Sequence, residues 1–289
     1  MNLTETASLP TVTFLGAGAM GGAIIKGLLT STERVAGEIR ATGQWSPQMQ
    51  ELTDTSSVVT YDTDADPEAN IKAVTDASII VLALKPDVVP PVLEQIAETL
   101  RPDAIVVSIA AGITIQTVES MLPEYVSVIR VMPNMPALVG KGVSGISPGT
   151  RAGGEAMEVV GQLFQTVGSV LAVPETQLDA LTSISGSGPA YVYFLIEQLT
   201  QVAIEQGFTP DQASVLVHGT FRGASELLAI SGKTPAELRT QVTSPKGTTA
   251  AALAILTDGR IKEVLSAATN AAVLRARELA VSPYLGLHG

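Results

Sequence analysis

The sequence has no cysteine, and only two of its 289 residues are histidine. Without thiols the chain has no disulfide, no zinc–thiolate or iron–sulfur site and no thiol nucleophile. His218 and His288 alone leave little material for a serine–histidine–acid triad or a histidine-based metal site. We therefore expect a function that needs neither a metal centre nor a thiol.

Basic residues are also few, because 17 Lys and Arg stand against 28 Asp and Glu for a net charge of -11. This balance argues against a broad surface for nucleic acid or anionic membranes, although backbone N–H groups can still hold a small anion. Gly, Pro or charge interrupts every apolar stretch before about 18 residues, and the N-terminus lacks a signal-peptide pattern. We expect a cytoplasmic protein without nucleic-acid or membrane partners.

What the chain does have is a large share of aliphatic residues, with 46% hydrophobic and only 4% aromatic residues, in a length that suits two domains. Its first half alternates strand-like and helical runs, which predicts an α/β domain with a doubly wound parallel sheet over residues 11–174. Predicted strands cover 12–15, 38–42, 78–84, 104–109, 127–132, 143–146 and 169–173. Predicted helices include 23–29, 91–100 and 151–167.

A glycine motif follows the first predicted strand. Gly16, Gly18 and Gly21 have the G-x-G-x-x-G spacing and precede a helical run. In a Rossmann domain the first glycine allows a tight turn, the second lets the backbone approach a pyrophosphate, and the third lets helix and strand pack closely. The motif therefore predicts a dinucleotide site.

Three further loops follow predicted strands: "ALKP" at 83–86, "SIAAG" at 108–112 and "MPN" at 132–134. Ligands of doubly wound sheets bind beyond the carboxyl ends of the strands, so these loops and the glycine loop predict a shared crevice. In contrast, "YDTDADPEA" at 61–69 has the acidic spacing of a calcium loop but lacks the required glycine and glutamate. We interpret it as a solvated loop.

The choice of cofactor depends on the end of the second strand, "ATGQWSP". It contains neither the acid that holds a ribose 2′-hydroxyl nor an arginine for a 2′-phosphate. Thr42 and Ser46 are either hydrogen-bonding partners of a 2′-phosphate or ordinary turn residues. This favours NADPH and leaves NADH possible.

From residue 175 onward strand signals stop, and several helices with apolar residues on nearly all sides follow. A helical domain over 175–289 has few places to bury so many apolar residues, which predicts oligomerisation through this half. Within it, "TSPKGTT" at 243–249 leads into an alanine-rich helix. These hydroxyls either cap the helix or, with its free N–H groups, hold a carboxylate or phosphate.

Seven motifs together resemble the pyrroline-5-carboxylate reductase family. They are "GAGAMG", "LALKP", "SIAAG", "RVMPNMP", "SGSGPAY", "TSPKGTT" and "RARELA", in the family's order from residue 12 to 279. The resemblance implies a Rossmann domain and an all-α dimerisation domain, with homodimers that assemble further, up to decamers. It also implies hydride transfer from NADPH to the cyclic imine carbon of 1-pyrroline-5-carboxylate, the last step of proline biosynthesis.

The resemblance also implies roles for individual residues. The pyrophosphate would lie on Gly16, Ala17, Gly18, Ala19, Met20 and Gly21. Other cofactor contacts would come from Asn70 at the adenosine ribose, from the MPN-loop residue Asn134, and from Ala83, Leu84, Lys85, Pro86, Ala110, Ala111 and Gly112. The substrate carboxylate would lie on Ser244, Gly247, Thr248 and Thr249.

Some roles in this last group stay open. Thr249 is also the candidate catalytic residue, because its hydroxyl can hydrogen-bond the ring nitrogen instead of the carboxylate, or both. Lys246 stands where the family usually has glycine, and either adds a cation beside the carboxylate or points outward. A protonated imine is already electrophilic, so the resemblance requires no strong acid, and positioning carries most of the catalysis.

Two other functions fit a Rossmann domain joined to helices. A β-hydroxyacid dehydrogenase would need a catalytic lysine in a G-x-x-G-x-G-x-x-x-x-K run, which this sequence lacks. A nicotinamide-sensing interaction protein would not need the hydroxyls beside Gly247.

Overall fold

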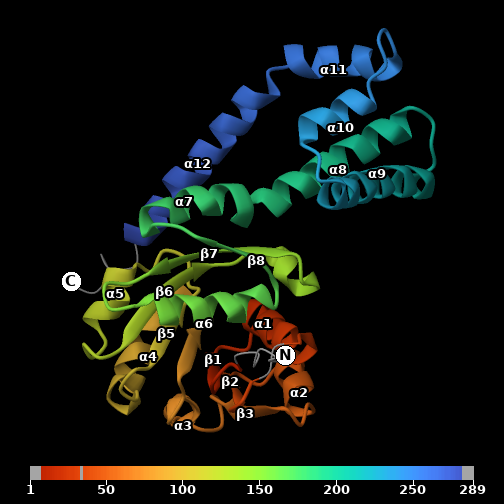
Figure 1. The fold of residues 1–289 in the computed structure, drawn as a ribbon. Coiled ribbons are helices and arrows are strands. Elements are labelled where there is room, and N and C mark those ends of the chain that lie inside the picture. Colours follow the sequence, from red (N-terminus) through yellow and green to blue (C-terminus); the bar gives the residue numbers. More distant parts are fainter. Residues whose placement is uncertain (1–7, 33–34, 282–289) are drawn as a thin grey trace, which may run out of the picture. The chain divides into compact units, whose positions relative to one another are not determined.

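The computed structural model describes residues 8–32 and 35–281, with side chains up to residue 278 (Figure 1). The chain forms two compact units. Among the described residues, one unit comprises those up to 186 together with 272–281, and the other is Ser187–Ala271. None of the described helices is at once long enough and apolar enough to cross a membrane.

The first unit is built on one eight-stranded sheet with the order β3-β2-β1-β4-β5-β6-β7-β8. Neighbouring strands are parallel except β6 and β7, which are antiparallel, so the predicted doubly wound parallel sheet is confirmed with one antiparallel pair. The order reverses between β1 and β4, as in other doubly wound sheets. The strands are β1 Val12–Leu15, β2 Ile39–Gly43, β3 Val58–Asp62, β4 Ile79–Leu82, β5 Ile105–Ser108, β6 Ser127–Met132, β7 Gly142–Pro148 and β8 Gly168–Ala172.

Helices cover both faces of this sheet (Figure 1). On one face α1, α2 and α6 bury aliphatic side chains against Val12 and Phe14 of β1. On the other face α3, α4 and α5 pack around Leu15 and Leu82. The helices are α1 Ala19–Thr30, α2 Pro47–Thr53, α3 Ala69–Val74, α4 Val89–Ile96, α5 Ile115–Ser120 and α6 Gly154–Gln165, with short 3-10 turns at Pro86–Val88, Ala97–Thr99, Met135–Val139 and Glu175–Gln177.

β1 and β6 begin and end where the sequence predicts, and the other predicted strands differ by one or two residues at each end. β3, α2, α3 and α5 were not predicted. β3 is one of the two edge strands, and beyond Val58 its side chains are only partly buried or exposed, so it carries a weak hydrophobic signal. Because Tyr61 and Asp62 end β3 and the buried Ala69 begins α3, the interpretation of 61–69 as a solvated loop is wrong at both ends of the segment.

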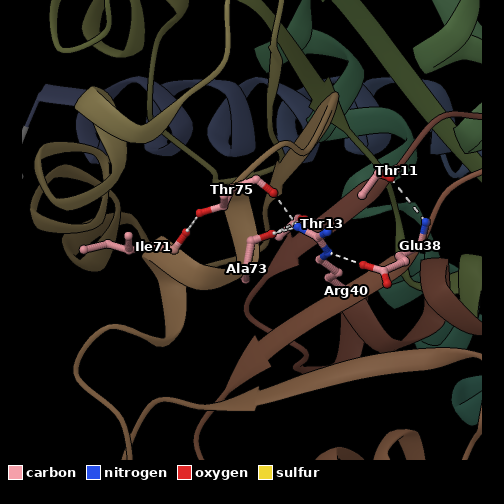
Figure 2. Close-up of polar contacts among 7 residues, drawn as sticks. All are labelled: Thr11, Thr13, Glu38, Arg40, Ile71, Ala73 and Thr75. Carbon is pink, nitrogen blue, oxygen red and sulfur yellow. Dashed lines mark hydrogen bonds and ion pairs between the residues drawn. The ribbon is translucent and has the colours of Figure 1, made fainter.

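Arg40 ties three elements together on the α3 face of the sheet, as Figure 2 shows. Its Nη1 donates to the carbonyl oxygens of Ala73 at 3.2 Å and Thr75 at 2.5 Å, and its Nε donates to Glu38 at 2.7 Å. Thr13 of β1 donates to the same Ala73 carbonyl at 2.7 Å. A cation at the end of α3 satisfies its last carbonyl groups and complements the helix dipole.

A second, largely buried ion pair closes the last segment of this unit onto the sheet. Arg130 of β6 donates to Glu175 at 3.0 Å, and the same carboxylate oxygen accepts the backbone N–H of Ile115 at 2.8 Å. The two charged side chains are 10% and 30% exposed. Glu175 therefore joins β6, α5 and the chain that leads out of β8.

After β8 the described part of the chain forms helices joined by short loops and no further strand, as predicted. A short helix, α7 Leu178–Leu181, runs into a π-helical turn at Thr182–Gly186. The second unit contains α8 Gly188–Glu205, α9 Pro210–Ser231, α10 Pro235–Gln241, α11 Thr248–Asp258 and the first half of α12 Ile261–Val281. Thr209 and Thr234 form capping boxes at α9 and α10, each followed by proline at the first helical position.

This second unit has a very small core of its own. Among the described residues its buried apolar cluster is Ala203, Ala213 and Val217. Many large apolar side chains are exposed instead, including Phe194 at 59%, Val215 at 74% and Ile230 at 82%. Exposed apolar area on this scale marks an interaction surface.

The Arg130–Glu175 pair supplies a test of the fold. Glu175→Gln should lower the free energy of unfolding by about 1–3 kcal/mol, because it leaves a buried guanidinium without a counter-charge. Asp103→Asn removes one partner of the exposed Arg101–Asp103 pair and should cost less than about 1 kcal/mol. Urea unfolding of both variants measures this difference, and equal losses would contradict the proposed role of the buried pair.

Candidate functional site

A cavity of about 550 Å³ opens beyond the carboxyl ends of β1, β2 and β4, where the strand order reverses. This is where doubly wound sheets bind their ligands. The predicted site residues that line it are Gly16, Ala17, Gly18, Thr42, Ser46, Asn70, Ala83, Leu84 and Lys85.

The three glycines of the motif have three different surroundings. A Cβ on Gly16 would overlap the carbonyl oxygen of Ala83, and Gly16 has a φ of 95°, which L residues rarely adopt. A Cβ on Gly21 would overlap the carbonyl oxygen of Gly16, whereas one on Gly18 would have no atom within 4 Å. Gly16 and Gly21 are thus required for close packing, and Gly18 borders open space that a bound group can fill.

The remaining predicted cofactor residues do not line this cavity. Ala19, Met20 and Gly21 form the first turn of α1, and Pro86 begins the 3-10 turn after β4. Ala110, Ala111 and Gly112 follow β5, where Gly112 has a φ of 78°. Asn134 follows β6 and is buried.

The side chain of Asn134 holds backbone in place. Its amide donates to the carbonyl oxygen of Ser185 at 2.9 Å and accepts from the N–H of Val143 at 2.8 Å. These two bonds fix the loop after β6 to β7 and to the π-helical turn.

Polar residues at the end of β2 are held by α3 and α2. The buried hydroxyl of Thr42 donates to Asn70 Oδ1 at 2.9 Å, and Asn70 Nδ2 donates to Gln95 at 3.0 Å. Ser46 accepts the N–H of Met49 at 3.2 Å and so caps α2. Its hydroxyl proton remains available to donate into the cavity.

Several lining residues were missed from the sequence: Gly43, Gln44, Gln48, Met49, Thr63, Val88 and Val92. Thr63 follows β3, and Gln48 and Met49 lie in α2, so they depend on two elements that were not predicted. The β-branched run at 58–60 and the Ser–Pro pair at 46–47 were the available signals.

The predicted substrate residues lie together in the second unit, in the turn that opens α11. Gly247 is the N-cap, and no side chain caps this helix, in contrast to α9 and α10. A Cβ on Gly247 would meet the Ser244 hydroxyl, so the two residues lie close together in this turn. Thr249 is partly buried, and Lys246 is exposed with a φ of 59°. The first N–H groups of α11 are therefore free of side-chain caps, beside three hydroxyls.

Two family models match the chain. Residues 11–112 match "NADP oxidoreductase coenzyme F420-dependent", and residues 175–279 match "Pyrroline-5-carboxylate reductase dimerisation". Pyrroline-5-carboxylate reductase of Pseudomonas aeruginosa is 36% identical over 94% of this chain and 98% of its own length. Pyrroline-5-carboxylate reductase 3 of Rattus norvegicus is 33% identical over 93% of this chain and 95% of its own.

Solved structures agree with these matches. The pyrroline-5-carboxylate reductase of Coxiella burnetii superposes with a TM-score of 0.86 at 30% identity, covering 93% of this chain and 97% of that one. The Plasmodium falciparum pyrroline carboxylate reductase, solved with NADP bound, has a TM-score of 0.77 at 26% identity, covering 93% and 98%.

Fold and cavity define the first unit as a dinucleotide-binding Rossmann domain, the domain of a nicotinamide-dependent oxidoreductase. With its matched dimerisation domain and full-length relatives, the chain belongs to the pyrroline-5-carboxylate reductase family.

The surroundings of the glycines predict opposite effects for two similar substitutions. Gly18→Val should leave the thermal unfolding temperature nearly unchanged but weaken NADPH binding roughly tenfold or more, because it fills the space that the pyrophosphate needs. Gly21→Val should instead lower the unfolding temperature, because its side chain meets the Gly16 carbonyl. Nicotinamide fluorescence titration and a thermal melt measure the two effects. NADPH affinity unchanged by Gly18→Val would rule out this placement of the pyrophosphate.

Proposed function

We propose that this chain reduces 1-pyrroline-5-carboxylate to L-proline, the last step of proline biosynthesis, by hydride transfer to the cyclic imine carbon. The observation that carries this proposal is family membership over nearly the whole chain. The glycine loop and the uncapped turn before α11 add the local chemistry that the reaction requires.

NADPH supplies the hydride when it is bound, and NADH is a possible substitute. The open space at Gly18 and the free N–H groups at the start of α1 suit the pyrophosphate. Lys85 lies in the same cavity and adds a cation for the phosphates. The rest of this cofactor site consists of Asn70 beside the adenosine ribose and the loops after β4, β5 and β6.

The substrate carboxylate binds at the turn before α11. The hydroxyls of Ser244, Thr248 and Thr249 donate hydrogen bonds to this carboxylate. The first N–H groups of α11 add backbone donors at the positive end of the helix. Thr249 is the candidate catalytic residue because its hydroxyl can also hydrogen-bond the ring nitrogen. A protonated imine accepts hydride without a strong acid, so this chain contributes mainly by positioning, worth up to roughly 7–11 kcal/mol in favourable cases.

The chain acts as a homo-oligomer. Its small second core and the exposed apolar faces of α8 and α9 need a partner surface, which the family's dimerisation domain supplies from a second copy. We propose that dimers form through residues 175–289, with 11–174 as the cofactor domain, and that they assemble further, up to a decamer, in the cytoplasm.

The substrate turn can be tested with Thr249→Val, which keeps the shape of the side chain and removes the hydroxyl. Loss of a hydrogen bond to a charged group costs about 1.5–3 kcal/mol, or one to two decades in kcat/KM for the imine acid. NADPH affinity should change little. Steady-state NADPH oxidation and fluorescence titration measure the two quantities.

The control substrate is 1-pyrroline, which lacks the carboxylate. It should be a poor substrate of the parent protein and lose little more with Thr249→Val. Equal losses for both substrates would mean that Thr249 serves the imine nitrogen or the fold, and would end the assignment of this hydroxyl to the carboxylate.

Assembly can be measured directly. Light scattering at micromolar protein should report at least twice the chain mass of 29.9 kDa, because the second unit buries too few apolar side chains within one chain. A monomer under these conditions would contradict the proposed dimerisation.

A further inference from the structure

At the end of the cofactor cavity near β2 and β3, the carboxylate of Asp64 contacts a residue that lines the cavity. The sequence did not predict this contact. Gln44 follows β2 and Thr63 follows β3, and both line the cavity. Gln44 Nε2 donates to Asp64 Oδ1 at 3.2 Å, although the two residues are 20 positions apart. The pairing of Gly43 with Asp62 in the β2–β3 register brings them together.

Other cationic side chains of this unit form ion pairs or hydrogen bonds with other groups. Arg40 is bound to Glu38 and to carbonyl groups at the end of α3. Lys26 pairs with Glu51 of α2 at 2.9 Å. Lys72 pairs with Asp66 at 2.7 Å, a bond that holds the pKa of the Asp66 carboxyl below its usual value.

Lys85 is the one cationic side chain among the described residues that line the cavity, and it lies at the other end. It follows β4, which is separated from β2 by β1. Asp64 follows β3, which is three strand spacings from β4, or roughly 14 Å and more than one Debye length at 0.1 M salt. The cavity is therefore polarised, with a cation on the β4 side and a carboxylate on the β3 side.

The adenosine ribose of a dinucleotide lies near the end of the second strand of such a sheet. Gln44 holds its amide nitrogen toward Asp64, which leaves its Oε1 to accept a hydrogen bond from a hydroxyl. A 2′-hydroxyl suits this arrangement. A 2′-phosphate carries close to two negative charges and would be repelled by Asp64.

We propose that Asp64 is a specificity-determining residue, which acts through Gln44 to lower the affinity for a ribose 2′-phosphate relative to a 2′-hydroxyl. The proposal rests on the proposed function, because it concerns NADH and NADPH at the same cofactor site. Asp64 would weaken the preference for NADPH over NADH, and the proposal does not exclude NADPH as the cofactor.

Nicotinamide fluorescence titrations with NADH and with NADPH test this proposal on the full-length protein. Asp64→Asn keeps the shape of the side chain and removes the charge. It should raise the affinity for NADPH relative to NADH by about three- to ten-fold at low salt, and by less at 0.5 M salt, because exposed charges are screened. Affinity for NADH should stay within about twofold, since the 2′-hydroxyl carries no charge.

The matched control is Asp54→Asn. Asp54 is also exposed and also accepts an amide hydrogen bond, from Gln50 at 2.8 Å, but it lies at the far end of α2 from Ser46. This variant loses the same charge and should leave the affinity ratio unchanged.

Each outcome decides the proposal. An unchanged ratio in Asp64→Asn, or an equal shift in Asp54→Asn, would overturn it while imine reduction by the parent protein still supports the proposed function. Failure of the parent protein to bind either nucleotide would overturn the proposed function and this inference with it. A shift confined to Asp64→Asn and weakened by salt supports it.

Discussion

The close contact between the glycine turn after β1 and the end of β4 determines where the glycine turn lies in the proposed cofactor site. The N–H groups of Gly16 and Ala17 donate to the Thr42 carbonyl of β2 at 3.1 and 2.8 Å, and the Ala83 N–H donates to Leu15 at 2.8 Å. Backbone from β1, β2 and β4 thus meets at one point, where Gly16 has no room for a side chain. Because three strands fix this turn, Gly16, Ala17 and Gly18 line the cavity in a defined position before any ligand arrives.

The two units solve the problem of burial in different ways. The first packs aliphatic side chains on both faces of its sheet, with β1 and β4 fully buried. The second buries three apolar residues and exposes many more along α8 and α9. This exposure is typical of a surface that another protein surface covers. The proposed substrate turn lies in the second unit, whereas all the residues that line the cavity come from the first unit.

Sequence reasoning found what is encoded locally. β1, the glycine loop and β6 follow from a short β-branched run and from fixed glycine spacing, which need no knowledge of distant residues. It missed β3, whose exposed edge weakens the alternating pattern, and with it Thr63 and Asp64. The Gln44–Asp64 bond depends on the β2–β3 register, and the use of Arg40 depends on where α3 ends. Neither contact can be predicted from a single segment, because each joins residues that are distant along the chain and meet only in the folded structure.

Electrostatics explains how so acidic a chain can bind anions at two places. In α6, α9 and α10 an acidic side chain lies in the first turn and complements the positive end of the helix dipole. α1 and α11 have glycine N-caps, no side-chain cap and no acid in their first turns. These are the two helices at which we propose that the pyrophosphate and the substrate carboxylate bind. Neutral backbone donors at those two points can hold an anion locally in a chain whose net charge is -11.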